Sequence, residues 1–282
     1  MRTIAFQGEL GAFSEEAARR FFAGPVDPVP CRSFAEVGEA VAEGRVDLGL
    51  LPIENSLAGS VVGSYDVLAG PELSVLGEVV TPIHHCLLAL PGVDMEELRQ
   101  VYSHPVALAQ CQRFFQGHPV LDAVAFYDTA GAAKEISERG QRAHAAIAGR
   151  AAADRYGLEI LAADIEDRHD NQTRFLVVAP AGATLPPDVA PASHADVKKT
   201  ALMVETKNVP GALVRFLLPF ADRGFNLSKL ESRPGAVPWS YHFFVEIEAG
   251  ADDAELAGAL AEAKELTSSF RVLGSFPKWV GG

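Results

Sequence analysis

The sequence predicts an α/β protein in which a two-lobed α/β domain is followed by a ferredoxin-like βαββαβ domain, and three observations support this. Short apolar segments alternate with helical segments from residue 3 to about residue 178, which is typical of α/β units. A proline-rich stretch, residues 181–197, then interrupts this pattern, as a linker does. The segments after it follow the order strand, helix, strand, strand, helix, strand.

The first lobe is expected to contain residues 1–80 and 161–180. Ser14 and Ser33 each precede a helical segment with glutamates in its first turn, so both are expected to be N-caps. The expected elements are strand 4–6, helix 14–22, helix 33–44, strand 48–51, a helix that carries Val61, Tyr65 and Leu68, and strand 75–80.

The second lobe is expected to span residues 81–160, after which the chain returns to the first lobe at Thr173 and leaves a cleft between the lobes. Its expected elements are strand 101–102, helix 104–115, strand 123–126, helix 128–139, strand 145–148, helix 150–156 and strand 158–161. The C-terminal domain, residues 198–282, should contain strand 200–205, helix 211–221, strands 227–231 and 241–247, helix 252–266 and strand 270–276.

Composition excludes several classes of partner. The chain has 282 residues and a net charge of −13, which argues against nucleic acid or an anionic membrane surface as a partner. No apolar run is long enough to span a bilayer, and no signal peptide precedes the first strand, so the cytoplasm is the expected location. Three widely spaced cysteines suggest neither a disulfide framework nor a zinc site. Adjacent His84 and His85 would point to opposite sides of a strand, so we expect no metal there.

The stretch Asn171–Phe175 places functional side chains at the mouth of a buried strand. Asn171 can donate and accept hydrogen bonds, Thr173 carries a hydroxyl, and Arg174 offers a charged fork suited to carboxylates. Neighbours in a strand point to opposite faces, so Thr173 and Arg174 should have different roles. The alternative is an ordinary edge strand with a solvated arginine.

Two other segments have the same character. Glu54, Asn55 and Ser56 follow a buried strand and could hold a hydroxylated, carboxylated ligand, or could simply cap a turn. The glycine-rich turn from Gly8 to Ser14 offers backbone N–H groups to an anion, or is only a tight turn. Its glycines lack the G-x-G-x-x-G spacing, so a dinucleotide site is not supported.

Taken in order, these segments resemble the prephenate dehydratase family over the first 178 residues and its attached ACT regulatory domain over residues 198–280. The motifs that carry the resemblance are Gly11–Ser14, Pro52–Ser56, Ser103–Pro105 with Gln110–Cys111, Asp128–Ala130, Asn171–Phe175, Asn208–Leu213 and Leu230–Pro234. Two positions depart from the family pattern: Asp128 stands where serine is usual, and Ala12 where glycine is frequent. The chorismate mutase helices of fused relatives are not expected, because the first strand starts at residue 3.

The resemblance implies conversion of prephenate to phenylpyruvate, with loss of carbon dioxide and hydroxide, in phenylalanine biosynthesis and without metal or cofactor. Thr173 would contact the departing oxygen, and Arg174 would anchor a carboxylate or hold the strand end. The implied catalytic residues are Thr173, Glu54, Asn55 and Ser56. The implied substrate-binding residues are Ser14, Ser103, Gln110, Thr129, Asn171 and Arg174.

The resemblance also implies feedback inhibition by L-phenylalanine and a homodimer or homotetramer assembled through the ACT domains. One side of the effector site would be a helix N-terminus with small residues, formed by Asn208, Pro210, Gly211, Ala212 and Leu213. The other side would come from the partner subunit and comprise Leu230, Glu231, Ser232 and Arg233.

Three other functions remain open from the sequence. The same residues would serve an arogenate dehydratase, which performs the same elimination on an amino-bearing substrate. A two-lobed α/β chain, periplasmic-binding-protein-like in architecture, could instead be a solute-binding protein, although the absence of a signal peptide counts against this. A catalytically silent amino-acid sensor is the third possibility.

Overall fold

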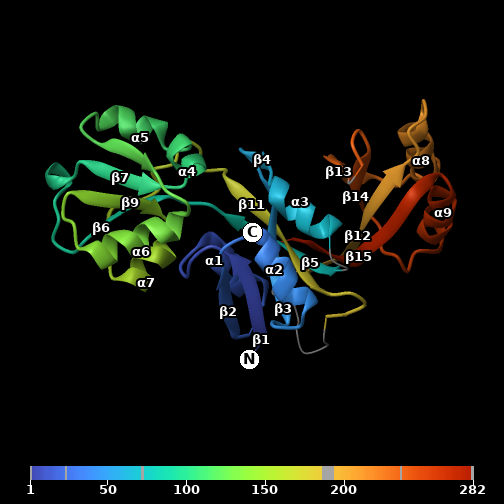
Figure 1. Cartoon of the computed structure of the whole chain (residues 1–282), viewed down its shortest axis with the longest axis horizontal. Helices are drawn as coiled ribbons and strands as arrows, with labels where there is room; N and C mark the ends of the chain where they lie inside the picture. The colour runs from blue at the N-terminus through green and yellow to red at the C-terminus, as the bar shows by residue number, and fades with distance from the viewer. Residues whose placement is uncertain (1, 23, 71–72, 186–193, 236, 281–282) are drawn as a thin grey trace.

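The computed structural model describes residues 2–22, 24–70, 73–185, 194–235 and 237–280. It confirms the predicted fold class, because a two-lobed α/β unit is followed by a βαββαβ domain. In Figure 1 the second lobe lies at one end, the first lobe in the centre and the C-terminal domain at the other end. Within the described residues, no helix has both the length and the apolar character needed to cross a membrane.

The first lobe is built on a six-stranded sheet in the order β2-β1-β3-β11-β5, with β4 paired to β3. Strands β1, β2 and β3 are parallel, and β11 runs antiparallel between β3 and β5. The strands are β1 (Arg2–Gln7), β2 (Val26–Cys31), β3 (Leu48–Asn55), β4 (Gly59–Ser60), β5 (Leu73–Pro82) and β11 (Gln172–Pro180). The helices are α1 (Phe13–Phe21), α2 (Phe34–Ala42) and α3 (Val62–Ala69).

Strand β11 is buried on both faces, as its continuous apolar run predicts. Phe175 and Val177 lie in the same core cluster as Phe21 of α1. Leu176 and Val178 lie in the other cluster, which also contains residues of α2 and α3. Residues 173, 175 and 177 therefore share one face of the sheet, and residue 174 lies on the opposite face.

The second lobe has a five-stranded sheet in the order β10-β6-β9-β7-β8. Its strands are β6 (Cys86–Ala89), β7 (Gln100–Ser103), β8 (Asp122–Ala125), β9 (His144–Ala148) and β10 (Glu159–Ala162). Its helices are the 3-10 turn Met95–Glu97, α4 (Pro105–Ala109), α5 (Gln112–Gly117), α6 (Thr129–Arg139) and α7 (Arg150–Tyr156). Two crossover segments, residues 83–85 and 163–171, join the lobes.

Helix 104–115 was predicted as one helix and is two. Cys111, with φ −119° and ψ 31°, leaves the helical conformation between α4 and α5. The second crossover fills the break, because the Asp167 backbone N–H donates to the Gln110 carbonyl oxygen and the Asp167 carboxylate accepts from the N–H groups of Gln112 and Arg113. The break thus ties the second lobe to a segment that connects the lobes.

Two local expectations in the first lobe also need correction. Ser14 is not an N-cap, because α1 begins one residue earlier and the Glu15 carboxylate accepts from the Gly11 N–H at 2.7 Å. Strand β2 was not predicted, since Pro28 and Pro30 break a strand pattern; both are tolerated at this sheet edge. Ser33 does cap α2 by accepting from the Glu36 N–H.

The C-terminal domain has four antiparallel strands in the order β13-β14-β12-β15. Its elements are β12 (His194–Thr206), α8 (Ala212–Ala221), β13 (Leu227–Pro234), β14 (Tyr241–Ile247), α9 (Ala254–Glu265) and β15 (Thr267–Trp279). Helices α8 and α9 cover one face of the sheet. Most of the expected linker, residues 186–193, lies outside the described residues.

The other face of this sheet packs directly on the first lobe. Met203, Phe244 and Phe276 belong to the same buried cluster as Leu176 and Val178 of β11. Strand β15 runs back to the centre of the molecule, as Figure 1 shows. The C-terminal domain and the first lobe therefore share a hydrophobic core.

Candidate active site

A cavity of about 610 Å³ lies between the two lobes. Its walls include Asn55 and Thr173 from the first lobe, Gln110 and Thr129 from the second, and His85 from the first crossover. This volume is typical of sites that hold small organic molecules. The cleft expected between the lobes is thus present.

The carboxyl ends of three parallel strands supply one wall of this cavity. Gln7 is the last residue of β1, Arg32 follows the last residue of β2, and Asn55 is the last residue of β3. All three line the cavity. Strand ends that meet at one sheet edge form the usual ligand crevice of open α/β sheets.

Asn55 and Thr173 face each other across the β3–β11 pair. The Asn55 Nδ2 atom donates to the Thr173 Oγ1 atom at 2.9 Å. Because Oγ1 accepts this bond, the Thr173 hydroxyl hydrogen is free to point at a ligand in the cavity. The cavity therefore presents a hydrogen-bond donor at the position expected from the sequence.

A chain of amide side chains continues from Asn55. Its Nδ2 atom also donates to Asn171 Oδ1 at 2.8 Å, and Asn171 Nδ2 donates to Gln110 Oε1 at 3.0 Å. His85 Nε2 lies 2.9 Å from the same Gln110 oxygen. Asn171 is fully buried and does not line the cavity, so it connects the two lobes behind the cavity wall.

Arg174 lies on the opposite face of β11 and does not line the cavity. Its guanidinium bonds to Glu78 at 2.9 Å and to Glu246 of the C-terminal domain at 2.8 Å. Burial lowers the pKa of Arg174, but the two carboxylates outweigh this and raise it overall. Of the two roles expected for Arg174, these contacts fit holding the strand end and not anchoring a substrate carboxylate.

Glu54 is also outside the cavity lining, because it pairs with Lys229 of β13 at 3.0 Å. Two serines expected at the site are likewise used elsewhere. The Ser56 hydroxyl donates to the Asp170 carbonyl oxygen and accepts from the Gln172 N–H, which fixes the loop beside β11. The Ser103 hydroxyl is buried and donates to the Ile147 carbonyl oxygen at 2.6 Å.

Helix N-termini from both lobes reach the cavity. Ser14, in the first turn of α1, and Thr129, the first residue of α6, both line it. Asp128 caps α6 by accepting from the Gly131 N–H at 2.6 Å, and burial raises the pKa of its carboxyl group. Where the family usually has serine, this chain therefore has a carboxylate that also lines the cavity.

Several lining residues were not singled out from the sequence, among them Arg32, His85 as a cavity residue, and Tyr127. Arg32 is the only lysine or arginine among the described residues that line the cavity. Arg32 directly follows a strand, a position that often carries functional residues, but the two prolines of β2 made this strand hard to predict from the sequence. Arg32 thus brings a positive charge to the cavity wall of a protein whose overall charge is negative.

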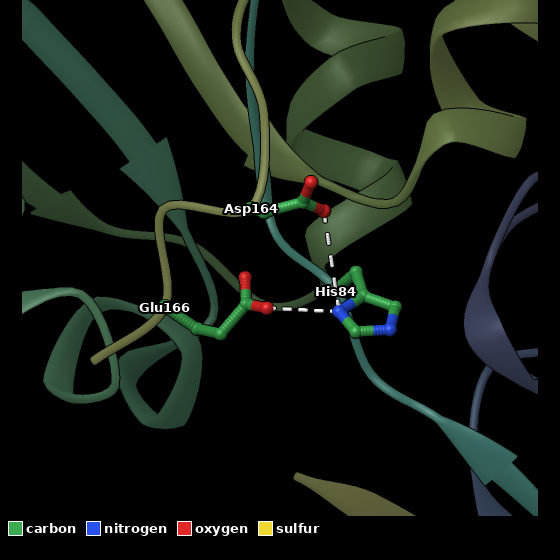
Figure 2. A group of neighbouring side chains, drawn as sticks. All are labelled: His84, Asp164 and Glu166. Atoms are coloured by element: carbon green, nitrogen blue, oxygen red, sulfur yellow. Dashed lines mark hydrogen bonds and ion pairs between the residues drawn. The ribbon is translucent and has the colours of Figure 1, made fainter. Parts of the chain in front are cut away.

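A possible metal-ligand cluster lies at the crossovers. Figure 2 shows Nδ1 of His84 directed at the carboxylates of Asp164 and Glu166, and the three ligand atoms lie within 4.8 Å of one another. The His84–Glu166 distance is 2.8 Å. Glu166 also accepts from the His85 backbone N–H and from His169. Protein groups thus already supply hydrogen bonds to this carboxylate, and the cluster ties one crossover to the other.

The C-terminal domain has a second cavity of about 360 Å³ beside the N-terminus of α8. Asn208, Gly211, Ala212 and Leu213 line it, whereas Pro210 does not. Its other lining residues include Trp239, Tyr241 and Phe243.

The segment expected from a partner subunit makes contacts within this chain. Glu231 accepts from the Ser60 hydroxyl at 2.7 Å, and Arg233 lies 3.8 Å from Asp66. Leu230 and Ser232 are exposed on the opposite face of β13. Glu231 and Arg233 therefore belong to the contact between the domains.

The fold is that of a two-lobed α/β protein with a cavity of small-molecule size between its lobes, followed by a βαββαβ domain with a second cavity. A family model described as prephenate dehydratase matches residues 4–183, and one described as ACT domain matches residues 200–265. The chain belongs to the prephenate dehydratase family and carries an ACT domain.

Relatives agree with this membership. A chloroplastic arogenate dehydratase/prephenate dehydratase of Arabidopsis thaliana is 40% identical, over 97% of this chain and 72% of the relative. The solved prephenate dehydratase of Arthrobacter aurescens in complex with L-Phe is 35% identical, with a TM-score of 0.86 over 97% of this chain and 89% of that chain. A structure described as GqqA, a novel type of quorum quenching acylase, is 37% identical, with a TM-score of 0.87 over 98% of both chains.

Proposed function

We propose that this protein is a prephenate dehydratase that produces phenylpyruvate, carbon dioxide and water, and that L-phenylalanine inhibits it. One observation carries the catalytic part: the Thr173 hydroxyl lies in the cavity wall with its oxygen already accepting from Asn55. Its hydrogen is therefore available to the hydroxyl group that leaves the substrate.

The reaction balances with the residues at hand. The bond from the ring to its carboxyl carbon breaks, and its electron pair enters the ring as the ring becomes aromatic. The carbon–oxygen bond at the opposite ring position breaks, and the oxygen departs with its pair and takes up a proton as water. Hydrogen bonding or proton transfer to that oxygen accelerates such steps by roughly 10²–10⁴-fold. Thr173 would polarise the oxygen or relay the proton, and Arg32 would pair with a substrate carboxylate.

Arogenate is the second candidate substrate, because relatives are named for both activities. The half-buried carboxyl group of Asp128 at the cavity wall favours it, since in its ionised form this group attracts the cation that an amino-bearing substrate brings. Side-by-side rates of phenylpyruvate formation from prephenate and phenylalanine formation from arogenate decide between the two.

One solved relative is described as an acylase, but the side chains of the cavity give acyl hydrolysis less support than dehydration. An acylase needs a nucleophile activated by a neighbouring base. Among the described contacts, no hydroxyl that lines the cavity is hydrogen-bonded to a histidine. If the purified protein produces neither phenylpyruvate nor phenylalanine, the proposed dehydratase function is wrong.

Regulation is proposed on the second cavity. Gly211 has φ of 74° and is the N-cap of α8, so the cavity adjoins the start of this helix. The Ala212 N–H donates to the Val209 carbonyl oxygen, which leaves the next N–H groups of the first turn for a ligand carboxylate. The aromatic side chains Trp239, Tyr241 and Phe243 offer a surface for a phenyl ring. Assembly as a dimer or tetramer through the ACT domains and a cytoplasmic location remain predictions; the plant relative is chloroplastic.

A further inference from the structure

The hydrogen-bond chain behind the cavity has a fixed direction, and this direction starts at the backbone. Asn55 Oδ1 accepts from the backbone N–H groups of Leu57 and Ala58, at 3.0 and 2.8 Å. A backbone N–H can only donate, so the oxygen of Asn55 must face these two groups. Its amide nitrogen is thereby directed at Asn171 and Thr173.

The orientation of each following amide is set by its hydrogen bond to the amide before it. Because Asn55 donates to the Asn171 oxygen, the Asn171 nitrogen faces Gln110 and donates to Oε1 of that residue. Turning any one of these amides around would bring two donors or two acceptors into contact, which leaves buried polar atoms unpaired. Gln110 therefore has its oxygen directed at Asn171 and its NH₂ group left for the cavity it lines.

The last member of the chain is His85. Gln110 Oε1 carries no hydrogen, so the hydrogen of the 2.9 Å contact must belong to His85 Nε2. The other ring nitrogen, Nδ1, is buried without a hydrogen-bond partner. A neutral imidazole with its hydrogen on Nε2 is the form that matches both atoms.

The surroundings of His85 favour this neutral form. Burial lowers the pKa of His85, the Gln110 bond and Glu166 oppose this effect, and His84 adds to it, so that the pKa lies below its ordinary value. The edge-to-face contact with Phe13, at 5.6 Å between ring centroids, fixes the plane of the imidazole from the first lobe.

We propose that His85 is a positioning residue of this active site, in addition to the residues that touch the substrate. By donating from Nε2 to Gln110 Oε1, His85 gives this oxygen its second hydrogen bond, and it thereby keeps the Gln110 NH₂ group directed into the cavity. Together with the Thr173 hydroxyl, this gives two donors of fixed direction. The proposal rests on the proposed function, because the carboxylate, keto and hydroxyl oxygens of prephenate can all accept hydrogen bonds from such donors.

Without the His85 donor, the Gln110 amide would lose one of its two constraints. Rotation of the amide would then bring Oε1 into the cavity, where it repels substrate carboxylates and oxygens. The rotated amide would also break the bond that Gln110 Oε1 accepts from Asn171, which in turn accepts from Asn55, the donor to Thr173. His85 thus acts through its neighbours and does not exchange a proton with the substrate.

The first test measures the tautomer directly. Long-range ¹⁵N–¹H NMR of the full chain, with His85 assigned by comparison with His85→Gln, should show a hydrogen on Nε2 and none on Nδ1 near neutral pH. A hydrogen on Nδ1 in the neutral ring would overturn the proposal. This result does not depend on which substrate the enzyme uses.

The second test compares two substitutions. In His85→Gln, the side-chain amide reaches the place of Nε2 and can donate to Gln110, so kcat should stay within about threefold of wild type. His85→Leu fills the space without a donor, and kcat should fall about 10- to 100-fold while KM changes less. His144→Leu, which removes a histidine far from the cavity, is the control and should leave kcat unchanged.

The outcomes separate this proposal from the proposed function. An inactive wild-type protein contradicts the dehydratase assignment, and the NMR result then still stands on its own. An active wild type with equally active His85→Leu and His85→Gln variants contradicts the positioning role. Equal loss in both variants, with unchanged thermal unfolding, would indicate that the imidazole itself takes part in the chemistry and would also overturn the proposal.

Discussion

At the scale of single residues, Thr173 and Arg174 show how one strand serves two purposes. They are neighbours in β11, yet Thr173 lines the cavity and Arg174 bonds to carboxylates on the opposite face. The alternation of a strand makes this separation inevitable. Substitutions at the two positions should therefore have different consequences.

Thr173→Ala should reduce kcat by roughly 10²–10⁴-fold, because it removes the donor to the leaving oxygen while keeping the Cβ atom. Thr173→Ser keeps the hydroxyl and should retain far more activity. Steady-state kinetics with prephenate and arogenate, together with thermal unfolding to establish that both variants fold, test this. Near wild-type kcat in Thr173→Ala would contradict the role given to this hydroxyl.

The buried imidazole of His85 has a consequence for stability against pH. Burial places its pKa below the ordinary value of 6.5, so below that pH the unfolded chain binds a proton that the folded chain does not. The free energy of unfolding should therefore fall as the pH drops below 6.5, and His85 contributes no pH dependence above it. Urea unfolding of wild type and His85→Gln across this range should show a shallower acid decline in the variant. Parallel curves would contradict the expected shift.

How far the sequence predicts the site depends on whether the partners are local. Asn55 and Thr173 were expected near a cleft because polar residues directly follow one apolar strand run and directly precede another, a pattern visible within a few positions. The partners of Arg174 were not predictable, since Glu246 lies 72 residues further along the chain and in another domain. Arg32 was not predicted as a site residue, because the two prolines of β2 are atypical of a strand and the end of this strand was therefore not predicted.

At the scale of elements, β11 joins the catalytic lobe to the ACT sheet. Arg174 and Lys199 face the buried carboxylates of Glu78 and Glu246, so that two positive and two negative groups are enclosed together. Burial raises the pKa of Glu78, but Lys199 and Arg174 outweigh this, and the pKa is lowered overall. The Trp279 backbone N–H also donates to Glu78. A cluster of this kind fixes the position of β14 and β15 against β11.

Arg174→Met should destabilise the fold strongly, because it leaves Glu78 and Glu246 with less positive charge in a buried setting. Breaking a buried ion pair from one side typically costs about 3–5 kcal/mol. Arg168→Met, which removes an exposed arginine paired with Asp170 at 2.6 Å, should leave the free energy of unfolding close to that of wild type. Urea unfolding of both variants makes the comparison, and equal stability would show that the cluster is not an important support.

At the scale of the whole molecule, the ACT domain contacts the catalytic cavity through its edge strand β13. Lys229 pairs with Glu54, which is next to Asn55, and Glu231 accepts from Ser60, which itself lines the cavity. The second cavity, proposed as the effector site, lies elsewhere in the same domain, beside α8. Movement of β13 would therefore be transmitted to the cavity wall through a few polar contacts.

Lys229→Met should separate effector binding from inhibition. The variant removes the contact to Glu54 but leaves every residue of the α8 cavity in place, so the Kd for L-phenylalanine should stay within about twofold of wild type. Inhibition should weaken at least fivefold, since allosteric coupling is typically about 1–3 kcal/mol and reciprocal between the two sites.

Lys278→Met, which removes a lysine paired with Glu248 at 2.7 Å, is the matched control and should be inhibited as wild type is. Calorimetric titration of L-phenylalanine beside inhibition curves provides both quantities. If Lys229→Met is inhibited as strongly as wild type, the signal does not pass through β13, and the shared core formed by β11 and β14 becomes the route to examine.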